Sequence, residues 1–131
     1  MNAWIPAELA RLRTNWPQLR YEENGHWVLL PGYLVPEGWN RTTTDLAVRI
    51  PENLPGQEPY GFWVRGGIAL ADGTAPTNYV FPGEAVPFEP SAQWGQFSWS
   101  LEGWAPGAQP GAGTGMVHFV QSIRHRLEEL N

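Results

Sequence analysis

The chain has 131 residues, the length of one domain, with 8 basic and 13 acidic residues and a net charge of −5. The negative charge argues against nucleic acid as the main partner, because phosphate binding requires basic patches. The absence of cysteine excludes disulfides, zinc–thiolate sites and thiol chemistry. No apolar run approaches the ~20 residues of a membrane span, and residues 1–5 lack the basic start and apolar stretch that are typical of a signal peptide. We therefore expect one cytoplasmic domain, residues 1–131, without a membrane partner.

Tryptophan is unusually frequent, with 8 residues, beside 15 glycines and 13 prolines. Large aromatic rings bury much surface each, so we interpret the tryptophans as filling a small core between irregular connections. The alternative is an exposed aromatic platform, which would suit a small-ligand or carbohydrate-binding domain.

The N-terminal segment has the periodicity of an amphipathic helix, with apolar residues on one face: Ile5, Leu9, Leu12 and Trp16. Pro6 suits its first turn and Pro17 ends it. Arg11 and Arg13 lie on the other side, which is either a solvated face or a docking surface.

Alternating and β-branched residues predict four strands, at 19–23, 26–30, 42–50 and 60–64. Asn24-Gly25 is a strong hairpin turn signal between the first two. The third, at 42–50, is the clearest half-buried strand. These strands predict a four-stranded antiparallel meander after the first helix.

The second half of the chain is mostly irregular. Residues 66–90 read as a loop with a turn at Asp72-Gly73, and residues 94–104 as a compact aromatic segment. Thr114 is a plausible N-cap for a final helix over residues 115–130. An apolar stripe supports that helix: Val120, Ile123, Leu127 and Leu130.

Chemistry-bearing residues are few. His118 and His125 lie seven residues apart, whereas a metal pair on a helix favours a spacing of four, so no metal site is expected. Ser98 and Ser100 lie between aromatic residues without a Gly-x-Ser-x-Gly motif. Spacing alone therefore does not identify a catalytic serine.

The ordered segments resemble the ubiquitin-conjugating enzymes. Residues 46–55 resemble that family's third strand and its Pro-containing turn, and residues 59–64 resemble the fourth strand. Trp104-Ala105-Pro106 resembles the Trp-Ser-Pro after the active site. The best fit is the bacterial branch, which is encoded beside activating enzymes and ubiquitin-like proteins. The resemblance implies an α+β fold with an N-terminal helix, a meander, a long active-site loop and a C-terminal helix.

The resemblance also implies a function, with departures from the family pattern. The chain would accept a ubiquitin-like protein from an activating enzyme, which uses the ATP, and pass it to a target protein in a bacterial pathway such as antiphage defence. No cofactor is implied for the chain itself. In the family the first helix docks on the activating enzyme, which assigns that role to Arg11 and Arg13. The His-Pro-Asn motif and the catalytic cysteine are missing, and Ser98 falls near the cysteine's position, with Ser100 as the alternative.

Three explanations of Ser98 remain open. The serine carries the ubiquitin-like protein as an oxyester, or the chain is an inactive binding module, or serine replaces a native cysteine by engineering.

A serine hydroxyl needs a base to take its proton. The candidate bases are Asp72, Glu102 and the three histidines, His26, His118 and His125. Asn78 and the backbone N–H groups of residues 98–100 are candidate oxyanion donors, but spacing places none of these groups beside Ser98.

Overall fold

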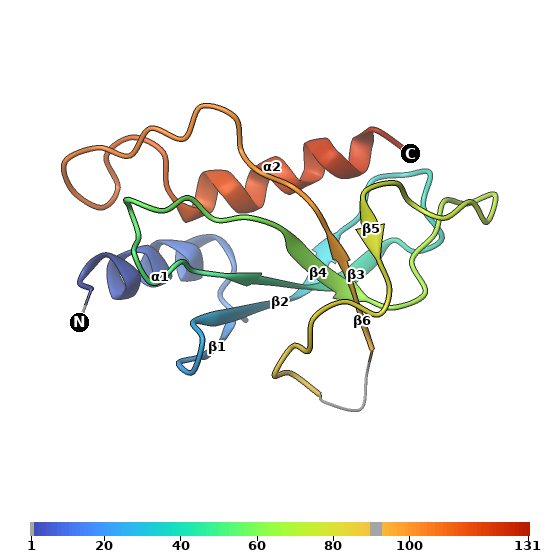
Figure 1. Ribbon diagram of the computed structural model, residues 1–131, viewed down its shortest axis with the longest axis horizontal. Helices are drawn as coiled ribbons and strands as arrows, with labels where there is room; N and C mark the ends of the chain where they lie inside the picture. Colours follow the sequence, from blue (N-terminus) through green and yellow to red (C-terminus); the bar gives the residue numbers. More distant parts are fainter. Residues whose placement is uncertain (1, 90–92) are drawn as a thin grey trace.

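The computed structural model describes residues 2–89 and 93–131. Helices α1 (Trp4–Asn15) and α2 (Met116–Glu128) lie on one face of a β-sheet (Figure 1). The strands, in chain order, are β1 (Arg20–Glu22), β2 (Trp27–Leu34), β3 (Thr43–Arg49), β4 (Phe62–Arg65), β5 (Tyr79–Val80) and β6 (Trp94–Phe97). Within the described residues, neither helix is long and apolar enough to span a membrane. The α+β class with a helix near each end is confirmed.

The sheet is larger than predicted. Over the residues that the structure describes, it has six antiparallel strands in the order β1-β2-β3-β4-β6-β5, whereas the sequence predicted four. Strand β6 was predicted only as an aromatic segment and β5 as loop. Neither shows a long alternating pattern, and each forms by pairing with a distant segment: Phe97 lies opposite Phe62 of β4 and opposite Tyr79 of β5.

The main core lies between the helices and the sheet. The predicted stripe of α1 is buried there at Ile5, Leu9 and Leu12. The stripe of α2 is buried from Val120 to Leu127, but Leu130 lies beyond the helix and is 43% exposed. Two buried side chains donate hydrogen bonds to the backbone of α2. The Trp39 indole donates to the Leu127 carbonyl at 2.8 Å, and the Tyr33 hydroxyl of β2 donates to the Val120 carbonyl at 2.9 Å.

A second apolar cluster covers the opposite face of the sheet. It combines strand residues with two from the irregular segment before residue 90: Trp27, Leu29, Ala47, Trp63, Trp94, Val86 and Phe88. The prediction of a half-buried strand at 42–50 is therefore wrong at Ala47, which is fully buried on the second face. An alanine carries too little apolar area to reveal this burial in a sequence pattern.

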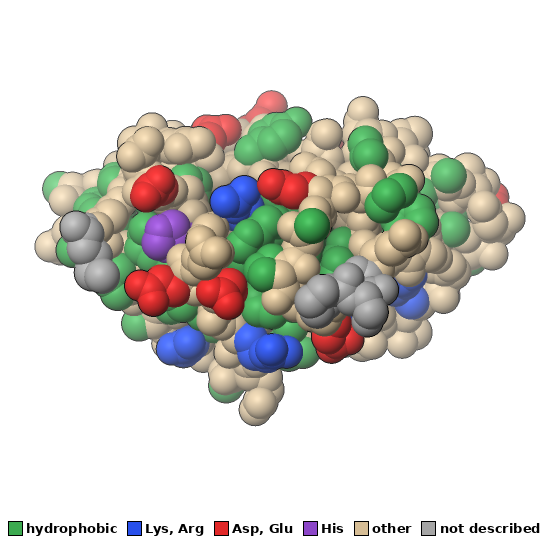
Figure 2. Space-filling view, turned by 60° about the horizontal axis from the view of Figure 1, so that its bottom comes forward, with side chains coloured by type: hydrophobic (Ala, Val, Ile, Leu, Met, Phe, Trp, Pro, Cys, Tyr) green, Lys and Arg blue, Asp and Glu red, His purple; other side chains and the backbone are tan. Residues whose placement is uncertain are grey.

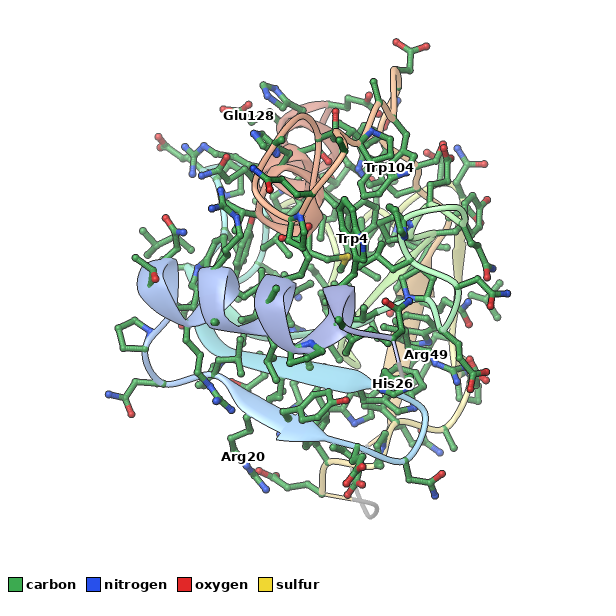
Figure 3. The ribbon with its side chains drawn as sticks, turned by 90° about the vertical axis from the view of Figure 1, so that its left-hand side faces the viewer. Trp4, Arg20, His26, Arg49, Trp104 and Glu128 are labelled. Atoms are coloured by element: carbon green, nitrogen blue, oxygen red, sulfur yellow. The ribbon has the colours of Figure 1, made fainter. Side chains whose placement is uncertain are left out.

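The tryptophans lie in the core or pack against it, and they do not form an exposed surface. Four are buried, namely Trp27, Trp39, Trp63 and Trp94, and the other four are partly buried against the main core. Trp4 and Trp104 lie where the first helix approaches the loop before α2 (Figure 3), and the Trp104 indole donates to the Pro55 carbonyl at 3.1 Å. This burial supports the core interpretation over an exposed platform.

The start of α2 corrects the predicted cap. Gly115, not Thr114, is the N-cap, and Thr114 Oγ1 instead accepts a hydrogen bond from the Ala105 N–H at 3.2 Å. The cap comes from α1: a carboxylate oxygen of Glu8 accepts the Met116 N–H at 3.1 Å. The Gly115 N–H donates to Nδ1 of His118 at 3.0 Å. A side chain 108 positions away thus acts together with the local contact from His118 to satisfy the first N–H groups of α2.

Candidate functional site

Ser98 follows the last residue of β6 directly. Phe97 is fully buried and stacks on Phe62 of β4 with ring centroids 4.8 Å apart, which fixes the end of the strand. Ser98 is exposed, and its backbone N–H donates to the Asn78 carbonyl at 2.9 Å. The buried phenylalanine therefore anchors the strand, and the following serine projects from the sheet into solvent.

An open cavity of about 720 Å³ adjoins Ser98. Its lining combines residues 98–102, here called the serine segment, with one residue before β4, one before β5 and the last turns of α2: Tyr60, Asn78, Ser98, Trp99, Ser100, Leu101, Glu102, Ser122, His125 and Glu129. Of the candidate bases, Glu102 and His125 share this cavity with the serines. Asp72 does not line it, and its carboxylate accepts a hydrogen bond from the Thr74 N–H at 2.9 Å in an exposed turn.

The other two histidines are engaged elsewhere. Nδ1 of His26 lies 2.7 Å from the Tyr21 hydroxyl at the β1–β2 hairpin, and Nδ1 of His118 accepts the Gly115 N–H at the start of α2. Figure 3 shows His26 near Arg49, at the sheet end of the molecule. Neither His26 nor His118 lines the Ser98 cavity, so His125 is the one histidine of the three that the structure places there.

Hydrogen bonds hold the serine segment from two sides. The Gly61 N–H donates to the Trp99 carbonyl at 2.7 Å, just before β4 begins. On the helix side, the Trp99 indole donates to Oγ of Ser122 at 3.0 Å, and that hydroxyl donates to the Phe119 carbonyl at 2.6 Å. The segment is therefore fixed relative to both β4 and α2, which limits its freedom before any substrate binds.

A buried arginine supports the turn that receives the Ser98 N–H. The Arg126 side chain is 3% exposed; its guanidinium lies 5.1 Å from the ring centroid of Phe97 and donates to the Thr77 carbonyl at 2.7 Å. Burial lowers the pKa of Arg126, but it remains a cation near neutral pH. Arg126 thus links α2 to the turn beside Ser98.

The candidate oxyanion donors separate into used and available groups. The Ser98 N–H is already bonded to the Asn78 carbonyl. Within the described residues, the backbone N–H groups of Trp99 and Ser100 donate no hydrogen bond, and the Asn78 side chain, which lines the cavity, makes none. These groups are therefore available to a developing negative charge on a bound acyl group.

Arg11 and Arg13 lie on α1 and do not line the Ser98 cavity. Nε of Arg11 lies 3.6 Å from the buried Glu8 carboxylate, and its side chain is 47% exposed; Arg13 is exposed. Figure 2 shows the face turned away from the helices, where acidic and basic side chains are interspersed among apolar ones. The role of Arg11 and Arg13 in docking on the activating enzyme stays a prediction.

Sequence reasoning missed several residues of the site. Tyr60, Ser122 and Glu129 line the cavity, and Trp99 holds the serine segment, yet none was singled out. Ser122 carried one usable signal, because it is a polar residue beside Ile123 in the apolar stripe of a helix. A buried hydroxyl at such a position requires a partner, and here the partner is Trp99.

The comparisons with known proteins place the chain in a family. The model of the family described as "Prokaryotic E2 family E" matches residues 10–129, which include the sheet, the serine segment and α2. Neither the curated proteins nor the solved structures gave a match. Because the family model covers nearly the whole chain, the chain belongs to Prokaryotic E2 family E, a bacterial family of conjugating-enzyme-like proteins.

Proposed function

We propose that the protein carries a ubiquitin-like protein as an ester on Ser98 and passes it to a target. The observation that supports this proposal most strongly is the position of Ser98: exposed, at the end of a buried strand, and beside a cavity open enough to admit a flexible C-terminal tail. The chain contains no cysteine to form a thioester. The proposal therefore assigns the nucleophile's role to the hydroxyl of Ser98.

The transfer step is an acyl exchange. Oγ of Ser98 attacks the thioester carbonyl of a ubiquitin-like protein held on the activating enzyme, and the tetrahedral intermediate places negative charge on the carbonyl oxygen. The available N–H groups of Trp99 and Ser100 support this charge if the oxygen lies within hydrogen-bond distance of them. Collapse of the intermediate breaks the carbon–sulfur bond, releases the thiolate and leaves an ester on Ser98.

The proposal is tested with the protein, its activating enzyme, the ubiquitin-like partner and ATP, followed by intact mass. We expect one adduct that resists thiol, is cleaved by hydroxide, and is lost in Ser98→Ala. Ser100→Ala is the matched control, a second cavity serine with the same side chain, and it should retain the adduct. Adduct formation unchanged in Ser98→Ala would overturn the assignment.

Ser98→Cys adds a chemical signature. A thiolate is the stronger nucleophile, so the variant should form its adduct faster, and the adduct should become sensitive to thiol. An inactive binding module, the second candidate, is favoured by the missing His-Pro-Asn motif. It predicts tight binding of the ubiquitin-like partner with no covalent adduct in the wild-type protein, an outcome that would refute the carrier.

A further inference from the structure

The Ser98 cavity contains a histidine whose ring is available for chemistry. His125 is the one histidine of the three that lines it, and its side chain is 78% exposed. Its Nδ1 lies 3.8 Å from a carboxylate oxygen of Glu128, one turn further along α2. Within the described residues, no hydrogen bond engages its Nε2, so this nitrogen can accept a proton from a group in the cavity.

The fold ties this histidine to the serine segment. Ser122 and His125 are three residues apart on α2 and therefore lie on the same face of the helix. The Trp99 indole donates to Oγ of Ser122 at 3.0 Å, and Trp99 is the residue after Ser98. The helical turn that carries His125 is thus bonded to the segment that carries the proposed nucleophile, and both border one cavity.

We propose that His125 is the general base for Ser98, oriented by Glu128. The inference rests on the proposed acyl transfer to Ser98. As Oγ forms its bond to the thioester carbon, its proton moves to Nε2 of His125, and the departing sulfur takes the electron pair of the carbon–sulfur bond. The imidazolium that results can return the proton to the thiolate, so atoms and charge balance. We expect Oγ of Ser98 and Nε2 of His125 to come within hydrogen-bond distance when the acyl group enters the cavity, because catalytic contacts often tighten only in the complex.

The charges around His125 favour this role. Carboxylates near a histidine stabilise the imidazolium that forms on proton transfer. The titratable groups that face the cavity or pair with this part of α2 are Tyr60, Glu102, Glu128 and Glu129, with Arg124 and Arg126. Both arginines are themselves paired with acids, at 3.4 Å to Glu128 and 3.8 Å to Glu129, which limits their opposition to a positive ring.

A partner-free assay isolates the base from the rest of the pathway. The wild-type protein is incubated with a small aryl thioester, S-phenyl thioacetate, and acetylation of Ser98 is followed by intact mass and peptide mapping between about pH 5 and 9. Imidazole acts as a base only when neutral, and histidines change charge between about pH 5 and 8. We expect the rate to rise through this range in the wild-type protein.

His125→Gln should lower the acetylation rate about 10²-fold or more and remove the rise with pH. His125→Ala should be rescued by imidazole added to the buffer, a response that a structural role would not produce. His26→Asn is the control, because His26 lies outside the cavity and Asn tolerates its positive φ of 55°; it should leave rate and pH profile unchanged. Since His125 is exposed, its variants should fold, which their circular dichroism spectra check.

The possible outcomes test the role of His125 as a base separately from the proposed carrier function. An unchanged rate and pH profile in His125→Gln would overturn the role of His125, while an adduct with the ubiquitin-like protein would still support the carrier. Acetylation of Ser98 that depends on His125, without any adduct from the activating enzyme, would support the base and refute the carrier. Loss of acetylation in Ser98→Ala confirms that the measured signal comes from this serine.

Discussion

Glu8 joins the two helices through a buried carboxylate. Its side chain is 1% exposed, and one of its oxygens accepts the Met116 N–H at the start of α2, a helix whose N-cap residue supplies no side-chain hydrogen bond. A negative charge at a helix N-terminus is also favoured by the helix dipole. Replacing Glu8 with alanine removes the cap, the charge and buried side-chain volume together.

The expected cost of Glu8→Ala is about 2 kcal/mol. Loss of an N-cap costs about 1 kcal/mol, loss of the dipole interaction about 0.5 kcal/mol, and the small cavity left behind about 1 kcal/mol. Relief of the desolvated carboxylate returns part of this. For a chain of this size the melting temperature should fall by about 8 °C. Glu8→Gln keeps the acceptor oxygen and should cost about half as much.

A second substitution tests the contact itself. A Cβ at Gly115 would clash with the Glu8 carboxylate, so Gly115→Ala should destabilise the wild-type protein and be better tolerated in Glu8→Ala. Urea unfolding followed by tryptophan fluorescence gives the four stabilities, and we expect a coupling energy of about 1 kcal/mol. Glu58→Ala, at an exposed position, is the control and should be neutral. Additive effects, or a Glu8→Ala variant as stable as the control, would refute this account of the helix start.

Two further predictions concern the site and the core. Trp99→Phe keeps an aromatic ring but loses the indole donor to Ser122, which is worth about 1 kcal/mol. Adduct formation on Ser98 should slow by about tenfold, and an unchanged rate would show that this bond does not position the serine. Burial raises the pKa of Tyr33 from 10.0 to about 12, and its hydroxyl donates to the Val120 carbonyl at 2.9 Å. The unfolded tyrosine loses its proton first as pH rises, so the free energy of unfolding should fall between pH 10 and 12 by up to about 1.4 kcal/mol per pH unit. Tyr33→Phe should lose that part of the pH dependence, and a slope identical to wild type would contradict it.

The sequence by itself determined the elements with a local period. Ile5, Leu9 and Leu12 recur at helical spacing, and they are buried on α1 as predicted. The third strand and the final helix were also recognisable, because burial of one face leaves an alternating or 3.6-residue pattern in the chain. The same segments, in order, carried the family resemblance that the match over residues 10–129 confirms.

The tertiary structure alone decided which groups meet. Strands β5 and β6 form only by pairing across the sheet, and Glu8 caps a helix 108 positions away. Ala47 is buried in a cluster that also contains Val86 and Phe88 from an irregular segment. The sequence offered five possible bases for Ser98 with nothing to rank them. In the structure, two of the five, Glu102 and His125, line the cavity beside Ser98. A periodic pattern reports only which face of its own segment is buried. Contacts between distant segments depend on the packing of the whole chain, and therefore the partner of Ser98 could not be derived from spacing.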